Sequence, residues 1–194
     1  GALYFSANDG THGAELWKSD GTEAGTLMLK DIRVGSVNFS TNSSPKDLIV
    51  AGNTLYFLAD DGQTGSELYK SDGTEAGTVL IDDKYPGRNG GANNNTLVAF
   101  GNHIIYKGYS KDYGQEPWIS DGTAAGTKML KDINPGTKFE GKLQIARGRI
   151  TNDNVFYFTE YDGVNGSEPS LWKLDLNTLS LKEPLNNITK VSMY

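Results

Sequence analysis

The sequence predicts an all-β fold: a single four-bladed β-propeller of four-stranded antiparallel blades that spans residues 1–194. Two observations support this prediction, namely a segment that recurs about every 50 residues and four short strand patterns within each recurrence. Self-similarity at this period is typical of stacked or radial units, because one such unit cannot bury its apolar face alone. A four-stranded antiparallel unit that repeats at this period is typical of a propeller blade.

The recurring segment begins at a glutamate and contains an aromatic residue followed by an Asp-Gly-Thr turn. From Glu15 it reads E-L-W-K-S-D-G-T-E-A-G-T, and from Glu67 it reads E-L-Y-K-S-D-G-T-E-A-G-T. From Glu116 it reads E-P-W-I-S-D-G-T-A-A-G-T, and a weaker copy from Glu168 reads E-P-S-L-W-K-L-D. The four starting residues are 52, 49 and 52 positions apart. The last copy departs from the pattern over 173–178, so we expect its hairpin to have a different shape.

The second copy shows the strands of one blade in chain order. A short apolar run at 47–51 is followed by the turn Gly52-Asn53 and by an aromatic and apolar run at 54–59. Turn residues follow, then an alternating strand at 67–71, an Asp-Gly-Thr turn, and a fourth strand at 78–81. Short strands separated by Gly, Asp and Asn are typical of a meander of hairpins. No window of the sequence shows sustained helical periodicity.

The ends of the chain indicate how the ring closes. The second strands of the copies begin near residues 3, 55, 104 and 155, and the first strands are expected at 47–51, 96–100 and 143–147. The first copy has no strand before it, whereas residues 190–194 resemble 48–51. We therefore predict that 190–194 pairs with the first blade and closes it. The alternative is a slice of a larger propeller, which the frame of the two ends disfavours.

The repeated motif resembles a known family. Glu-Leu-Trp-x-x-Asp-Gly-Thr, followed by Gly-Thr and by a strand with Lys-Asp-Ile, resembles the ELWxxDGT repeat family of large secreted and surface proteins. The resemblance covers all four copies, strongly in three of them. It implies an extracellular location, secreted or at the cell surface, and a propeller-like architecture, but it implies no particular chemistry.

Composition excludes several classes of protein. The 194 residues contain no cysteine, which excludes disulfides, zinc–thiolate sites and a cysteine nucleophile. The net charge of −6 comes without a basic stripe, so we expect no binding to nucleic acid. No apolar stretch approaches the length of a membrane span, and we expect no membrane insertion. Because Gly1 lies inside a repeat, either a leader has been removed or the chain is part of something longer.

Residues that recur in every copy are expected to serve the fold. The turn aspartates should accept local backbone N–H bonds beside a glycine with positive φ. The aromatic residue of each copy is expected to be a buried wedge between blades rather than a platform for sugar. The glutamates that open the third strand are expected to bond turn amides. These sets are Asp20, Asp72 and Asp121; Trp17, Tyr69, Trp118 and Trp172; and Glu15, Glu67, Glu116 and Glu168.

Residues that differ between copies are the candidates for binding. The segments between blades vary most, and they share one face of the predicted propeller with the loops between the second and third strands. Arginine, asparagine and aromatic side chains suit the polar edges and apolar faces of a saccharide; the alternative is that these loops are merely solvated. The candidate ligand-binding residues are Arg33, Phe39, Tyr85, Arg88, Asn89, Asn94 and Phe139.

No cofactor is required by the sequence, and calcium is the metal left open. A metal would lie either in the central channel, where first-strand carbonyls converge, or in the loops after the second strand, where aspartates recur once per copy. Hard cations such as Ca²⁺ favour carboxylate and carbonyl oxygens. The alternative is ordinary turn chemistry, since no Asp-x-Asp-x-Asp-Gly loop is present. The candidate ligands are Asp9, Asp61, Asp112 and Asp162, and the candidate glycosylation sites are Asn38, Asn42, Asn94, Asn165 and Asn187.

Catalysis finds little support, since His12 and His103 lie in non-equivalent turns and lack a Ser or Asp partner at a recognised spacing. We therefore predict that the protein is not an enzyme. The favoured function is a secreted, multivalent, lectin-like module that binds a glycan or a cell-surface polysaccharide. The alternative is a structural or adhesive propeller among neighbouring proteins of an extracellular surface assembly, and the third reading is an enzyme that acts on polysaccharides.

Overall fold

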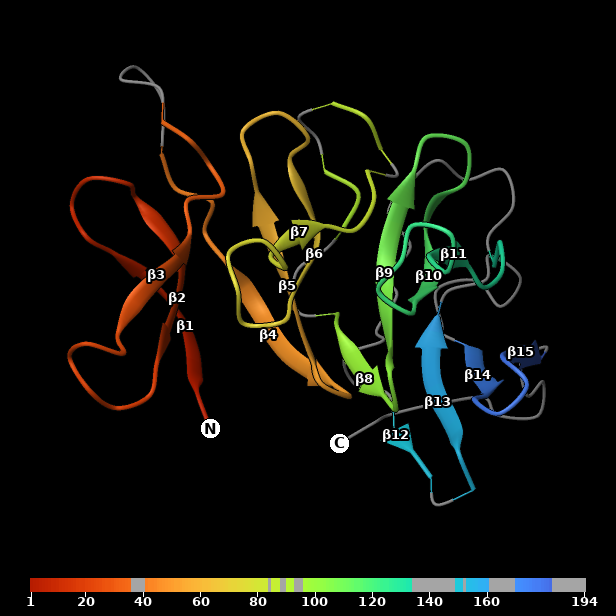
Figure 1. Ribbon diagram of the computed structural model, residues 1–194. Coiled ribbons are helices and arrows are strands. Elements are labelled where there is room, and N and C mark those ends of the chain that lie inside the picture. The colour runs from red at the N-terminus through yellow and green to blue at the C-terminus, as the bar shows by residue number, and fades with distance from the viewer. Residues whose placement is uncertain are drawn as a thin grey trace.

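The computed structural model describes residues 1–35, 41–83, 85–87, 90–92, 96–133, 149–151, 153–160 and 170–182. Over these residues the chain is all β, with four antiparallel sheets and no helix. It follows that none of the described segments is a helix that could cross a membrane. Each sheet corresponds to one copy of the repeat. Figure 1 shows the sheets in sequence order across the view, from the red first sheet at the left to the blue fourth sheet at the right.

Every sheet is a meander in which strands that are consecutive in the chain pair with each other. The first sheet consists of β1 (Leu3–Asn8), β2 (Ala14–Ser19) and β3 (Leu27–Lys30). The second consists of β4 (Lys46–Ala51), β5 (Thr54–Asp60), β6 (Ser66–Ser71) and β7 (Val79–Leu80). The third consists of β8 (Val98–Phe100), β9 (His103–Ser110), β10 (Gly114–Ser120) and β11 (Lys128–Met129). The fourth consists of β12 (Arg149–Ile150), β13 (Val155–Glu160), β14 (Ser170–Asp175) and β15 (Ser180–Lys182).

The predicted strands are confirmed except for the first strand of the first sheet and the first strand of the fourth sheet. The first sheet has three strands among the described residues, and the predicted closing strand at 190–194 lies outside them. In the fourth copy the strand that pairs with β13 is β12, at Arg149–Ile150, whereas the prediction placed it at 143–147, which lies outside the described residues. The turn before β13 is closed by bonds from the Thr151 N–H to the Val155 carbonyl and from the Asn154 N–H to the Thr151 carbonyl.

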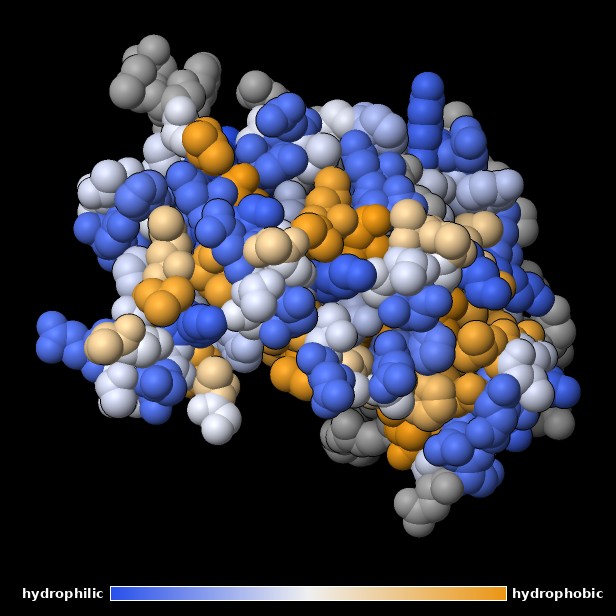
Figure 2. All heavy atoms as spheres, in the orientation of Figure 1, coloured by the Kyte–Doolittle hydropathy of each residue, from blue (hydrophilic) through white to orange (hydrophobic). Residues whose placement is uncertain are grey.

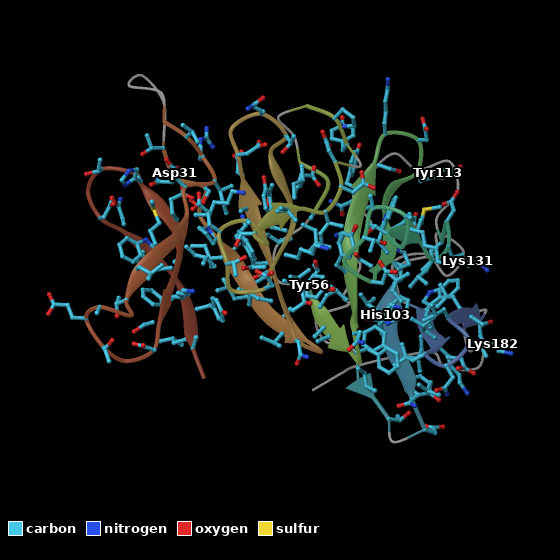
Figure 3. All side chains as sticks on the ribbon, viewed as in Figure 1. Asp31, Tyr56, His103, Tyr113, Lys131 and Lys182 are labelled. Carbon is cyan, nitrogen blue, oxygen red and sulfur yellow. The ribbon has the colours of Figure 1, made fainter. Side chains whose placement is uncertain are left out.

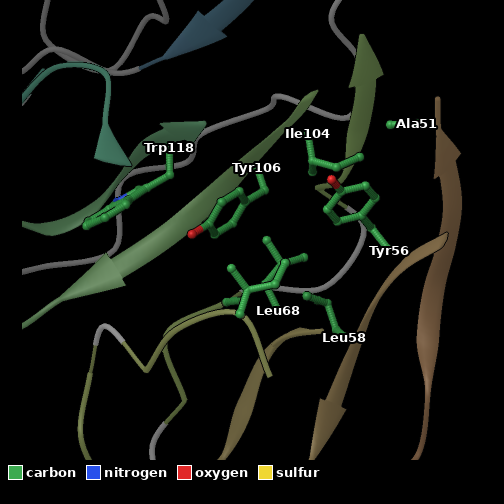
Figure 4. Packing of buried hydrophobic residues seen from close by; sticks show 9 residues of the cluster. Ala51, Tyr56, Leu58, Leu68, Ile104, Tyr106 and Trp118 are labelled. Atoms are coloured by element: carbon green, nitrogen blue, oxygen red, sulfur yellow. The ribbon is translucent and has the colours of Figure 1, made fainter. Parts of the chain in front are cut away.

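The core lies between neighbouring sheets, as the face-to-face contact of blades requires. Successive side chains of β5 point to opposite sides of the second sheet. Leu55 and Phe57 join a buried cluster with the first sheet, whereas Tyr56 and Leu58 join one with the third sheet. Figure 4 shows the second of these clusters, in which Tyr56 lies beside Ile104 and Leu58 lies beside Leu68. Burial of both sides of the sheet is what a blade inside a propeller needs.

Three of the four aromatic residues of the repeat are wedges between sheets, as predicted. Tyr69, Trp118 and Trp172 are only 5%, 7% and 2% exposed, and each belongs to the cluster between its own sheet and the preceding one. A Cβ on Gly108 would lie 2.5 Å from the Trp118 ring, so this ring packs directly on glycine backbone. Trp17, in the first sheet, is half-buried.

The sheets have two distinct ends. One end carries the hairpin loops at 9–13, 61–65 and 111–113 together with the crossings from sheet to sheet; we call it the loop face, and it is uppermost in Figure 1. The other end carries the Asp-Gly-Thr turns that follow β2, β6 and β10; we call it the turn face. The repeated residues dominate the turn face and the variable residues dominate the loop face.

Candidate functional site

The Asp-Gly-Thr turns are closed by their own side chains. Asp20 Oδ1 accepts bonds from the Thr22 N–H (2.9 Å) and hydroxyl (2.7 Å). Thr22 Oγ1 in turn accepts the Gly25 N–H at 2.9 Å, and the Thr26 hydroxyl donates to the Thr22 carbonyl at 2.6 Å. The same bonds recur around Asp72 and Asp121. The structural role predicted for these aspartates is therefore confirmed.

The turn of the fourth sheet is different, as its divergent sequence predicted. Asp175 Oδ1 accepts the N–H groups of Asn177 and Thr178 at 2.9 and 3.1 Å. Only residues 176–179 separate β14 from β15, whereas seven residues, 20–26, separate β2 from β3. The fourth turn thus keeps the aspartate cap without the threonine and glycine network.

Buried glutamates hold the crossings that support the loop face. Glu15 is fully buried, and its carboxylate accepts the Ile32 N–H and the Ser43 N–H, each at 2.9 Å. Glu67 accepts the Gly91 N–H, and Glu116 accepts the Ile133 N–H at 2.9 Å. Each carboxylate therefore fixes a segment that leaves its sheet or enters the next one. The predicted bonds to backbone amides are present for these three residues, but the amides belong to the crossings between sheets and not to the turns.

In the fourth sheet the buried carboxylate lies on the neighbouring strand. Glu67 stands opposite Ala59 across β6 and β5, whereas Ser170 stands opposite Glu160 across β14 and β13. Glu160 is 2% exposed. The large acidic residue and the small residue have thus exchanged strands. The sequence reading gave this role to Glu168, which lies outside the described residues; the cross-strand register needed to find Glu160 is not visible in a motif alignment.

The glutamate site has unusual electrostatics. The pKa of Glu67 is raised to about 8, mainly because the side chain is buried. The bond from the Gly91 N–H lowers this pKa, and the nearby carboxylates of Asp83, Asp82 and Asp61 raise it. Burial also raises the pKa of Glu15. Because removal from water disfavours the charged form, these groups hold a proton over part of the range in which an exposed glutamate is ionised.

The backbone beneath the loop face is the same at the first two junctions. The segment that enters the second sheet bonds both sheets, since the Ser44 N–H donates to the Ala14 carbonyl and the Asp60 N–H to the Ser43 carbonyl, each at 3.0 Å. At the next junction, the Ala92 N–H donates to the Ser66 carbonyl at 3.1 Å and the Tyr109 N–H to the Gly91 carbonyl at 2.7 Å. Ala14 and Ser66 are 52 residues apart and Asp60 and Tyr109 are 49 apart, which are the repeat spacings, so the two sets of bonds are equivalent.

Different side chains meet beside these two equivalent sets of backbone hydrogen bonds. At the first junction, Arg33 Nη1 donates to Asp60 Oδ2 at 2.9 Å, and the two side chains are 20% and 38% exposed. At the second junction, the rings of Tyr85 and Tyr109 meet edge to face, with centroids 4.7 Å apart. Tyr85 follows Arg33 by 52 residues and Tyr109 follows Asp60 by 49, which are the repeat spacings. An ion pair at one junction is thus replaced by an aromatic pair at the other.

A third tyrosine lies at the same end of the third sheet. Tyr113, in the loop between β9 and β10, is 48% exposed, and Figure 3 shows it toward the upper end of the view, whereas Tyr56 and His103 lie lower. Figure 2 shows the molecule in the orientation of Figure 1, with the loop face along the upper edge, where most residues are hydrophilic. The loop face therefore offers aromatic and charged groups to solvent on a backbone that hydrogen bonds join to neighbouring sheets.

The ligand-binding candidates divide into two sets. The structure places Arg33 and Tyr85 on the loop face, at equivalent positions of successive junctions. Asp60, Tyr109 and Tyr113 were not selected from the sequence, because the sequence does not show which residues the crossings bring beside Arg33 and Tyr85. The other candidates, Phe39, Arg88, Asn89, Asn94 and Phe139, lie outside the described residues.

The described aspartates offer no ready set of ligands for calcium. Asp9 Oδ1 accepts the N–H groups of Thr11 and His12, and Asp61 Oδ1 accepts those of Gln63 and Thr64, so each serves its own turn. Asp112 lies in a third separate loop, and Asp162 lies outside the described residues. Across the part of the chain that the structure describes, no three acidic or histidine side chains form a group that could hold a metal ion. The calcium site stays a prediction of the sequence.

The histidine that the sequence left without a partner has one. His12 Nδ1 lies 2.6 Å from Asp9 Oδ2, within one hairpin loop. Bonds from the His12 backbone and ring lower the pKa of Asp9, and the same contact raises the pKa of His12. The pair lies within a local turn, and no hydroxyl group of the described residues hydrogen-bonds the ring.

The sequon at Asn42 is part of the crossing between the first two sheets. Asn42 Oδ1 accepts the Ala14 N–H at 2.7 Å, and the next residue, Ser43, is 1% exposed. This asparagine therefore contributes to packing in the folded chain. The other candidate glycosylation sites, Asn38, Asn94, Asn165 and Asn187, lie outside the described residues.

Comparison with known proteins supports the fold. No family model and no curated protein matches the chain, so the resemblance to the ELWxxDGT repeat family stays a prediction from the motif. Two crystal structures of puromycin hydrolase, one of them of a mutant, match with TM-scores of 0.57 and 0.55 at 12% and 14% sequence identity. Each match covers 93% of this chain and 26% of the other, so the chain spans about a quarter of their length.

The matched structures are β-propeller domains, and the chain accordingly has a β-propeller-like fold. A structure of prolyl endopeptidases matches in the same way, with a TM-score of 0.50 at 13% identity over 93% of this chain. At these identities the likeness concerns the fold alone, because one fold carries many unrelated activities.

Proposed function

We propose that this chain is a non-catalytic recognition module that binds carbohydrate through its loop face. The observation that carries the proposal is the pair of equivalent positions at which Arg33–Asp60 is replaced by Tyr85–Tyr109 over the same backbone frame. A scaffold that repeats while its exposed contacts vary is typical of a binding surface, since binding residues are often placed on loops that a rigid core positions.

The side chains at these positions suit a saccharide. Aromatic rings stack on the apolar faces of pyranose rings, and charged or amide groups bond the hydroxyl groups at their edges. Tyr85, Tyr109 and the exposed Tyr113 supply rings at the third sheet, and Arg33 with Asp60 supplies both a donor and an acceptor at the second. Two unlike sites on one face favour a polymer over a single sugar, since linked weak sites add avidity.

The proposal includes a secreted or cell-surface location and a ring of four blades closed by residues 190–194. Two exposed apolar residues support the closure. Leu3 of β1 is 66% exposed and Val50 of β4 is 57% exposed, and both lie near the turn-face end beside the edge of β1 that has no strand partner among the described residues. A strand added to this edge would pair the free backbone groups of β1 and cover both side chains.

A glycan array tests the proposal. The pure chain is expected to bind one class of oligosaccharide, and Tyr85→Ala and Tyr109→Ala should each weaken binding about tenfold or more by removing a ring from the contact surface, a loss of about 1.4 kcal/mol. The matched control is Tyr4→Phe, which alters a tyrosine at the turn face and should leave binding unchanged. Unchanged thermal melting of the Tyr85 and Tyr109 variants would assign the loss to the site.

Two results would contradict the proposal. Silence across a broad array together with a stable protein complex would favour the structural or adhesive propeller. Turnover of a polysaccharide by the pure chain would favour an enzyme.

A further inference from the structure

Each of the first two sheets contacts a turn glycine of the next sheet through one tyrosine and one lysine. Tyr4 and Lys18 stand opposite each other across β1 and β2. Lys18 Nζ donates to the carbonyl of Gly73, in the turn of the second sheet, at 2.7 Å. A Cβ on Gly73 would lie 2.5 Å from the Tyr4 hydroxyl, so the tyrosine closes on the same glycine. We call this contact of Tyr and Lys with the turn glycine of the next sheet the lysine–tyrosine lock.

The lock recurs at the second junction with the same geometry. Tyr56 and Lys70 stand opposite each other across β5 and β6. Lys70 Nζ donates to the Gly122 carbonyl at 2.7 Å, and a Cβ on Gly122 would lie 2.6 Å from the Tyr56 hydroxyl. The lock is therefore a property of the repeat rather than of one junction.

At the third junction all three positions of the lock are apolar. Ile105 and Ile119 occupy the opposed pair across β9 and β10, and Leu176 follows the turn aspartate of the fourth sheet where the other turns have glycine. These three residues belong to one buried cluster and are at most 3% exposed. The opposed pair of the third sheet and the turn residue of the fourth sheet are both apolar at this junction. A polar pair thus faces a turn glycine, and an apolar pair faces a turn leucine.

The fourth sheet carries the polar pair again. Tyr157 and Lys173 stand opposite each other across β13 and β14, on the side that points away from the third sheet, and both are half-buried. The matching glycine is Gly21, in the turn of the first sheet, whose φ of 94° is close to the 89° of Gly73. Among the described residues, nothing lies within 4 Å of a Cβ built on Gly21. The two ends of the chain thus hold complementary halves of one lock.

We infer that the fourth sheet packs against the first sheet of the same chain, with Lys173 donating to the Gly21 carbonyl and the Tyr157 hydroxyl closing on Gly21. This inference rests on the closed ring of the proposed function and names the contact that closes it. Figure 1 draws the two sheets at opposite ends of the series, so the inferred contact is one that the structure does not contain.

The apolar side of the first sheet supports the same partner. Leu3 is 66% exposed, and Phe5 and Trp17 are half-buried, whereas the equivalent Leu55, Phe57 and Tyr69 are at most 5% exposed beneath the preceding sheet. The fourth sheet would cover this surface as every other sheet covers its successor. The two halves belong to one chain, so they meet at an effective concentration on the order of millimolar, far above that of a second copy in dilute solution.

A double-mutant cycle between Gly21→Ala and Tyr157→Phe tests the contact. The added methyl group meets the tyrosine hydroxyl only if the lock forms, so Tyr157→Phe should recover part of the melting temperature that Gly21→Ala loses. The reference cycle is Gly73→Ala with Tyr4→Phe, whose contact is present in the structure. We expect the two cycles to agree in sign and size in a chain that light scattering shows to be a monomer. Lys173→Met should lower the melting temperature by about 2–4 °C, as expected for losing one hydrogen bond in a chain of this size.

The outcomes separate this inference from the carbohydrate proposal. Coupling between Gly21 and Tyr157 in a monomer supports the lock, whatever the glycan array shows. No coupling, with the reference cycle intact, overturns it even if glycans bind. Coupling that appears only in a dimer, and weakens on dilution, overturns closure within one chain.

Discussion

The first and third junctions of this molecule solve the same packing problem with different chemistry. Between the first and second sheets, Lys18 donates to the Gly73 carbonyl and the Tyr4 hydroxyl lies against the same glycine, at the edge of an apolar cluster. Between the third and fourth sheets, Ile119 and its neighbours replace every polar part of that contact with buried hydrocarbon. The lysine, the tyrosine and the turn glycine that they contact are thus replaced together, and we call these three residues a matched set. Replacing one of them alone would leave a buried charge or a cavity.

The largest expected effect on stability comes from placing the lysine of the lysine–tyrosine lock at the apolar junction between the third and fourth sheets. Ile119→Lys puts an ammonium at a position that is 1% exposed, in the same buried cluster as Leu176, and should reduce the free energy of unfolding by about 3–5 kcal/mol, as for an uncompensated buried charge. Adding Leu176→Gly should recover part of the loss, because it opens a carbonyl at the place that Gly73 holds in the second sheet. Urea denaturation measures both. The control Ile119→Met should cost less than about 1.5 kcal/mol; no recovery in the double variant would contradict the matched set.

The second prediction concerns the glutamate that changed strands. Glu67→Ser removes the acceptor of the Gly91 N–H and should cost about 1–3 kcal/mol, the penalty of leaving a buried donor unmet. Adding Ala59→Glu reproduces the arrangement of Glu160 and Ser170 and should recover stability. Thermal melting of the two variants decides the matter, and a double variant less stable than Glu67→Ser would show that the two strands are not interchangeable.

The third prediction concerns pH. Since burial raises the pKa of Glu67 to about 8, the folded chain keeps a proton that the unfolded chain releases near pH 4.5. The stabilisation is therefore complete below about pH 4.5 and is lost as the pH rises through 8. The melting temperature should fall between pH 5 and 8.5, and Glu67→Gln, which cannot ionise, should flatten that decline. An equal decline in both proteins would place the ionising group elsewhere.

The smallest effect is expected from the lysine–tyrosine lock itself. Lys18→Met keeps the alkyl stem of the side chain and removes its 2.7 Å bond to the Gly73 carbonyl, so it should cost about 0.5–1.5 kcal/mol. Lys70→Met should behave alike at the second junction. Chemical denaturation with both variants provides the measurement, and a gain in stability in either one would show that the lock is retained for register rather than for strength.

The repeat made much of the fold predictable, because each turn and strand carries its own local signal. The role of Asp72 follows from Asp-Gly-Thr chemistry, and that of Tyr69 from its place in an alternating strand. The strand exchange between Glu67 and Glu160 could not be predicted, since it depends on which residues stand opposite each other across two strands. Likewise, Arg33 and Tyr85 could be selected from sequence, but Asp60 and Tyr109 needed the crossing path that brings them together.

The meander topology has a consequence for how the chain reaches its native state. Every strand pairs with its neighbour in the chain, and the turn network around Asp20 closes within seven residues of sequence. Loops this short cost little entropy to close, so each hairpin can form early and without help from distant residues. Docking of complete sheets would follow as a separate, slower event. During synthesis the first sheet can therefore assemble while later repeats are still being translated, and each junction can form as soon as the next sheet is complete.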